Sequence, residues 1–148
     1  MKAVKTLILL VNDKEARMLK NDGVGKGLHQ LEHIERDAAL GAEIAYADGP
    51  GRSQGGSGGA RHGMEPSTSE VRQNRERFAA HVLDAAEAHW AKGGYDRLVV
   101  AAPAKMLGAV RERMPRALAD KMQGDLAKDL LHTPVADLPG HFGDMAAF

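Results

Sequence analysis

A glycine-rich segment is the first place in the sequence where residue types and spacing suggest chemistry. Five glycines lie from Gly51 to Gly59, and Arg52, Arg61 and His62 bracket them. Glycine lets backbone N–H groups approach a phosphate closely, and arginine offers a phosphate two parallel donors. The pattern is neither G-x-x-x-x-G-K-[ST] nor a G-x-G-x-x-G that follows a strand. Two interpretations are therefore open, an anion-binding loop or a flexible Gly-Ser surface loop over about 49–66.

A second candidate site is the sequence VVAAPAKMLG, in which a predicted strand runs into a predicted helix. In open α/β sheets, ligands bind in the crevice beyond the carboxyl ends of the strands. A helix that begins at Pro103 points free N–H groups and a positive dipole end at that crevice, and Lys105 adds a charge. The other interpretation is structural, with Pro103 as a helix starter and Lys105 as a surface lysine.

Basic residues gather downstream of this junction. The segment 105–121 contains two acidic residues, Glu112 and Asp120, and five basic ones. The basic residues are Lys105, Arg111, Arg113, Arg116 and Lys121. Such a segment can contact RNA phosphates, or it can be the solvated face of a helix. With two tyrosines and one tryptophan in the chain, stacking of bases on an aromatic platform is not indicated.

Histidine spacing gives little support for a metal site. His62 and Glu65 lie three residues apart, and His29 and His33 four apart, spacings that can serve a metal on a helix. Neither pair lies on a predicted helix or has an evident third ligand. The sequence therefore predicts no metal and no cofactor.

No set of nucleophile, base and acid can be recognised, so no catalytic residue is assigned. Asp129 lies three residues before His132 and could accept a hydrogen bond from it. We interpret Asp129 as a cap or an ion-pair partner rather than a catalytic acid. The residues favour a non-enzymatic role and leave enzymatic activity open.

Hydrophobic patterning predicts the elements that position these residues. Strands are expected at 4–11, 16–19, 28–34 and 97–102, and within 122–131. Residues 36–66 show no sustained period and are expected to form a long loop. A long helix should run from about Thr68 to Lys92, with Ser67 and Glu70 as a capping box and Gly93-Gly94 as its end.

Prolines divide the second half of the chain. A helix starts at Pro103, Pro115 breaks or restarts it, and 117–121 forms a second helical piece. A short helix is expected over 134–142. Three strands, a loop and then alternating helices and strands predict an α/β fold, with one mixed β-sheet flanked by helices.

Composition narrows the class of protein. The chain has 148 residues, which suits a single domain over 1–148, and its formal net charge is zero. No cysteine is present, which excludes disulfides and Cys-ligated metals. The apolar run LILLV is too short to span a bilayer, and no cleavage pattern follows it. We expect a cytoplasmic protein without a membrane partner.

Several segments resemble the bacterial host-attachment protein family, whose members are described as required for attachment to host cells. In chain order they are PGR at 50–52, ARHGMEPST at 60–68, RFA at 77–79, YDRLVVAAPAKMLGAVR at 95–111 and KDLLH at 128–132. The resemblance covers most of the chain, and it includes residues on both sides of the glycine run.

This resemblance implies a ribonuclease H-like fold similar to the middle domain of archaeal and eukaryotic peptide-chain release factors and of Pelota. In release factors, that domain carries a Gly-Gly-Gln loop that promotes hydrolysis of peptidyl-tRNA. Here the nearest string is Ser53-Gln54-Gly55-Gly56, in which glutamine precedes the glycines. The departure argues against ester hydrolysis, whereas Pelota-like domains lack the triplet and still act at ribosomes.

We therefore expect a host-attachment family protein that binds tRNA or the ribosome, with attachment as its phenotype. The expected anion- or RNA-binding residues are Arg52, Arg61, His62, Pro103, Lys105, Arg111 and Arg113. One alternative is a hydrolase of peptidyl-tRNA or a related ester that uses the 51–62 loop. Another is a protein-interaction module, including a homo-oligomer formed through the long helix.

Overall fold

The computed structural model describes residues 3–41 and 68–148, and its centre is one five-stranded sheet. The strands are β1 (Thr6–Val11), β2 (Glu15–Asn21), β3 (His29–Glu35), β4 (Arg97–Ala101) and β5 (Met122–Leu126). They lie in the order β3-β2-β1-β4-β5. β1 is antiparallel to β2 and parallel to β4, so the predicted mixed sheet is confirmed.

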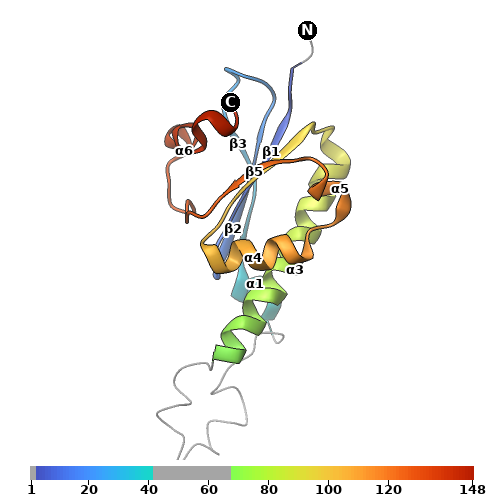
Figure 1. Ribbon diagram of the computed structural model, residues 1–148, viewed down its shortest axis with the longest axis vertical. Helices are drawn as coiled ribbons and strands as arrows, with labels where there is room; N and C mark the ends of the chain where they lie inside the picture. The colour runs from blue at the N-terminus through green and yellow to red at the C-terminus, as the bar shows by residue number, and fades with distance from the viewer. Residues whose placement is uncertain (1–2, 42–67) are drawn as a thin grey trace, which may run out of the picture.

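The helices are α1 (Arg36–Leu40), α3 (Thr68–Gly93), α4 (Ala104–Arg113), α5 (Arg116–Ala119) and α6 (Leu138–Phe142). Short 3-10 turns flank α6, η2 (Val135–Asp137) before it and η3 (Gly143–Met145) after it. Figure 1 shows α6 on the opposite side of the sheet from α3. None of the helices within the described ranges combines the length and apolarity needed to cross a membrane.

β1 is buried on both faces because each face of the sheet has its own apolar core. Leu7 and Leu9 pack with residues of α3 and α4, whereas Ile8 and Leu10 pack with the chain after β5. All six residues of β1 are buried, which explains why its residues 7–11 form a continuous apolar run rather than an alternating one. The sheet is therefore enclosed by helices on one face and by the C-terminal segment on the other.

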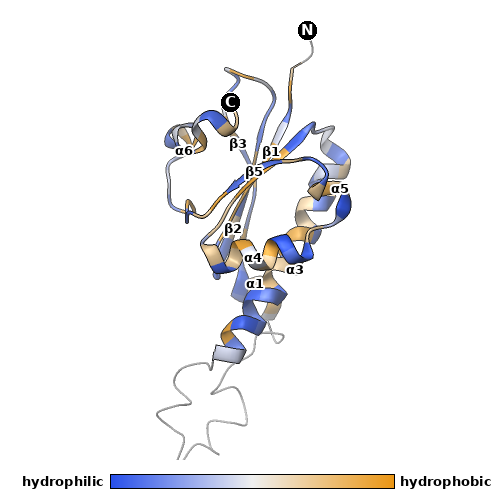
Figure 2. Ribbon diagram, viewed as in Figure 1, coloured by the Kyte–Doolittle hydropathy of each residue, from blue (hydrophilic) through white to orange (hydrophobic). Residues whose placement is uncertain are grey.

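The long helix α3 confirms the predicted element over 68–92 and ends one residue later. Gly94 follows it with φ 64°, a left-handed conformation that glycine adopts without steric cost. Ser67, the predicted cap, lies outside the described residues. The buried face of α3 starts beyond its first turns, with Phe78 and Val82 in the core. Figure 2 shows these first turns as mostly hydrophilic.

One sequence-based expectation is wrong. The predicted loop over 36–66 begins with helix α1, in which Leu40 is buried against the core under α3. A helix of five residues is too short to display a periodic pattern.

His29 and His33 both lie on β3, where residues four apart are separated by roughly 13 Å, so they cannot share a metal ion.

Candidate functional site

A cavity of about 560 Å³ lies beyond the carboxyl ends of β1 and β4, where α4 begins. Four parts of the chain form its wall, namely the turn after β1, the first turns of α3, the start of α4 and the segment after β5. The lining residues are Asn12, Asp13, Lys14, Arg75, Pro103, Ala104, Lys105, Met106 and Asp129. The two candidates at the strand-to-helix junction, Pro103 and Lys105, are thus brought to one cavity.

The start of α4 leaves backbone donors at this cavity. Pro103 is the N-cap, with ψ 152°, so it stands one residue before the helix rather than in its first turn. The Leu107 N–H donates to the Pro103 carbonyl oxygen at 2.8 Å. The N–H groups of Ala104, Lys105 and Met106 precede that bond and have no partner within the helix. Donors of this kind, with the positive end of the helix dipole, favour anions.

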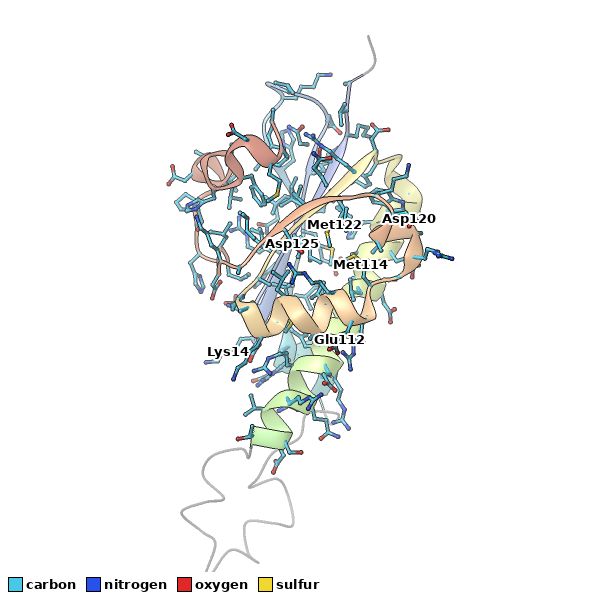
Figure 3. The ribbon with its side chains drawn as sticks, viewed as in Figure 1. Lys14, Glu112, Met114, Asp120, Met122 and Asp125 are labelled. Carbon is cyan, nitrogen blue, oxygen red and sulfur yellow. The ribbon has the colours of Figure 1, made fainter. Side chains whose placement is uncertain are left out.

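Two lysines add positive charge to the cavity wall. Lys14 comes from the turn after β1 and Lys105 from the first turn of α4, and both are exposed. Neither forms an ion pair with another described residue. Figure 3 shows Lys14 near the amino-terminal end of α4. Both ammonium groups are therefore available to a ligand.

Arg75 is bound to a carboxylate on the cavity wall. Its Nε donates to Oδ1 of Asp13 at 3.1 Å, and its Nη2 donates to Oδ2 at 3.0 Å. This two-point geometry is the one in which arginine binds carboxylate or phosphate most strongly. The pair joins the first turns of α3 to the turn that follows β1.

Asn12 and Asp129 form another part of the cavity wall. The Asn12 Oδ1 accepts from the backbone N–H groups of Lys14 and Glu15, which shapes the turn after β1. The Asn12 Nδ2 donates to Asp129 Oδ2 at 3.0 Å, and the Leu131 N–H donates to Asp129 Oδ1 at 3.1 Å. Asp129 thus accepts one hydrogen bond within its own turn and one from the turn after β1, and it forms no ion pair with another described residue.

His132 does not contact Asp129, contrary to the contact that their spacing allows. The His132 Nε2 lies 3.5 Å from Glu15 Oε2, and the His33 Nε2 lies 2.8 Å from Glu15 Oε1. Over residues 3–41 and 68–148, no three His, Asp or Glu side chains are arranged to hold a metal ion. The other histidine pair, His62 with Glu65, lies outside the described residues.

The basic segment 105–121 is less available to RNA phosphates than its sequence suggests. Arg111 donates to Asp125 through Nε at 2.8 Å and Nη2 at 2.7 Å. These hydrogen bonds, and then the charge of Asp125, raise the pKa of the Arg111 guanidinium. Arg113 Nη2 lies 3.1 Å from Glu76 Oε1. Both acidic partners come from other elements, β5 and α3, so the sequence of the segment alone does not reveal them.

Two smaller hollows adjoin the cavity along α3. One has a volume of about 180 Å³ and lies between α3 and α4, and the other, of about 400 Å³, lies at the first turns of α3. Arg75 and Lys105 line both hollows as well as the cavity, and Arg72 lines both hollows. Sequence reasoning did not select Arg72 or Arg75, because on a predicted helix they are ordinary residues of the solvated face.

The remaining candidates, Arg52, Arg61 and His62, lie outside the described residues, so their role stays a prediction. The positions of Pro103 and Lys105 fit the predicted crevice, and their binding of an anion also stays a prediction. The described site brings together a helix start, two unpaired lysines and an arginine that is held by a carboxylate. Such an arrangement can hold a phosphate, and it contains no recognisable nucleophile with a base.

Comparison with known proteins identifies the family of this sequence. A sequence model described as "Bacterial archaeo-eukaryotic release factor family 12" matches residues 5–141. No curated protein matches the chain. One similar solved structure is described as "Crystal structure of archaeal translation termination factor, aRF1", with 14% identity and a TM-score of 0.45. The similarity covers 85% of this chain and 31% of that one, so this chain spans about a third of its length.

Proposed function

Because the chain belongs to Bacterial archaeo-eukaryotic release factor family 12, we propose that it acts in translation as a non-enzymatic protein that binds tRNA or the ribosome. The family match includes every residue of the cavity wall. The observation that carries the binding proposal is the cavity itself, in which backbone donors of α4 and two lysines converge beyond the parallel strands. RNA offers such a site its phosphate groups.

The charge of the cavity wall supports a phosphate ligand. Three basic side chains and two carboxylates line it, and Arg75 and Asp13 are already paired with each other. Asp129 is held by Asn12 and by a backbone N–H, which leaves Lys14 and Lys105 as the charges without an internal partner among the described residues. The local balance is therefore positive although the whole chain is neutral.

We assign the principal contact to Lys105 and the start of α4 after Pro103. Arg111 and Arg113 belong to the proposed surface, but each would have to exchange an internal carboxylate for phosphate. Arg52, Arg61 and His62 are proposed as further contacts on the glycine-rich segment. Self-association through α3 has less support, because the apolar face of that helix already packs in the core.

Host attachment is proposed as a phenotype that follows from a cytoplasmic role in translation. On this proposal, a strain that carries a binding-defective variant should lose attachment and ribosome association together. Loss of ribosome association with normal attachment would separate the two and remove the link.

The proposal is tested by co-sedimentation of the purified protein with bacterial ribosomes, and by its binding to tRNA, across a salt series. Lys105→Gln should weaken binding by about tenfold at low salt, because a charge-assisted contact to phosphate is lost. Lys92→Gln is the matched control, since Lys92 is exposed in the last turn of α3. Absence of binding to both ribosomes and tRNA at low salt would overturn the proposal.

A further inference from the structure

Arg75 is one of two residues that line the cavity and both hollows, and its side chain is held by an ion pair with Asp13. Arg75 lies on α3 between the buried residues Asn74 and Phe78, and its side chain is 14% exposed. Lys105, which lines the same three spaces, is exposed and forms no ion pair with another described residue. A guanidinium held in place at the junction of three spaces is well suited to fix one group of a ligand.

In the described structure, that guanidinium forms an ion pair with Asp13. The carboxylate contacts Nε and Nη2 at 3.1 and 3.0 Å, which are the donors that a phosphate would use. Asp13 is 38% exposed and belongs to a turn, so its side chain can rotate into water. Arg75 has no such freedom.

We infer that Asp13 is an internal competitor for phosphate, which masks Arg75 in the free protein and releases it to a bound RNA phosphate. The inference deepens the proposed function and rests on it. The exchange costs little, because one two-point, charge-assisted pair of Arg75 is replaced by another. Phosphate takes the place of the carboxylate on the same two donors.

The consequence is selection for a chain of phosphates over a single small anion. An isolated anion gains only the exchange at Arg75, whereas a strand of RNA also brings neighbouring phosphates to Lys105 and Lys14. Arg72 extends the basic lining toward the start of α3, although it is itself paired with Glu76 at 3.0 Å. The mask therefore suppresses binding of solvent anions and leaves binding of a polyanion possible.

The test measures binding of fluorescently labelled deacylated tRNA by anisotropy across a salt series. Asp13→Asn should bind tRNA about fivefold more tightly than the unmodified protein, because the competing ion pair is gone. The slope of the plot of log K against log salt should stay the same, because Arg75 contacts the same phosphate in both proteins once tRNA is bound. Inorganic phosphate serves as the single-anion probe, and it should compete with tRNA more effectively for Asp13→Asn.

A double-mutant cycle separates unmasking from a general change of charge. In an Arg75→Gln background, Asp13→Asn should give no gain, because no arginine remains to be released. Asp129→Asn is the matched control, since it removes a carboxylate from the same cavity without freeing an arginine. An equal gain with and without Arg75, or an equal gain from Asp129→Asn, would overturn the inference.

The outcome also distinguishes this inference from the proposed function. If Lys105→Gln weakens tRNA binding and Asp13→Asn leaves it unchanged, the proposed function stands and the mask is rejected. If the unmodified protein binds ribosomes but no tRNA, the proposed function stands and the mask is rejected, and if it binds neither, both are rejected. Should Asp13→Asn fail to fold, the NMR signal of the Arg75 Nε–H group in the unmodified protein decides, since unmasking requires it to shift when tRNA is added.

Discussion

At the scale of single residues, the pKa values of ionisable groups in this protein depend on partners that are distant in sequence. Tyr95 follows α3, stacks on Trp90 with ring centroids 5.8 Å apart, and has Lys5 Nζ 5.6 Å from its ring centre. Burial, and then the nearby charge of Asp22, raise the pKa of the Tyr95 hydroxyl. Both causes disfavour the phenolate, so the folded state holds this proton more tightly than the unfolded chain does.

This shift predicts a loss of stability in alkali. Because the folded pKa is raised above the unfolded value near 10.0, the contribution of Tyr95 is fully present below that pH. It is lost as the pH rises through the folded pKa. Urea unfolding measured between pH 8 and 11 should show a smaller alkaline decline in the free energy of unfolding for Tyr95→Phe than for the unmodified protein.

Lysines also titrate in this range, so the informative quantity is the difference between the two proteins at each pH. Asp22→Asn should remove part of the same dependence, because it removes the second cause of the shift. Parallel pH profiles for Tyr95→Phe and the unmodified protein would contradict the assignment.

At the scale of elements, the sequence predicts what local patterns determine and misses what packing determines. The four strands over 4–11, 16–19, 28–34 and 97–102 are found within a few residues of their expected bounds, because apolar runs between turn residues are local signals. The short helix α1 was missed because its formation depends on Leu40 reaching the core.

The candidate site also has a part that local sequence patterns predict and a part that only the fold determines. The crevice at Pro103 could be predicted from strand-to-helix order alone, because strand ends and helix starts meet at one edge of such a sheet. The partner of Arg75 could not, because Asp13 is 62 residues away and only the fold joins them. The ion pairs of Arg111 and Arg113 were hidden for the same reason.

Gly93 and Gly94 have different structural roles, although the sequence predicts them together as one helix stop. Gly94 has φ 64°, as a stop requires, but Gly93 is needed for a different reason. A Cβ atom on Gly93 would overlap the ring of Tyr95. Gly108, inside α4, has open space around the position of its Cβ.

Alanine should therefore have opposite effects at two helical glycines. Gly93→Ala should lower the free energy of unfolding by about 1–2 kcal/mol, because Tyr95 must leave Trp90 and Lys5. Gly108→Ala should raise it by about 0.5–1 kcal/mol, because alanine favours the helix and meets no neighbour. Chemical unfolding of both variants checks the pair, and a loss at both positions would contradict the contrast.

At the scale of the whole molecule, neutrality makes any contact with RNA local. The chain carries 20 basic and 20 acidic residues, so no net charge draws a polyanion to the surface at large. Many of the basic residues in and near the site are paired with carboxylates, including Arg72, Arg111 and Arg113. Among the described residues, binding must then depend on the few cations that the cavity presents.

This neutrality predicts a shallow salt dependence for the proposed tRNA binding. Lys14, Lys105 and an unmasked Arg75 can neutralise about three phosphates, so the slope of log K against log salt should be roughly −2 to −3. Anisotropy titrations from low to physiological salt give the slope directly. Lys105→Gln should make it shallower by about 1, while Lys92→Gln should leave it unchanged. A slope near −6 or steeper would require a phosphate-binding surface well beyond this cavity, because its three basic side chains cannot release that many counterions.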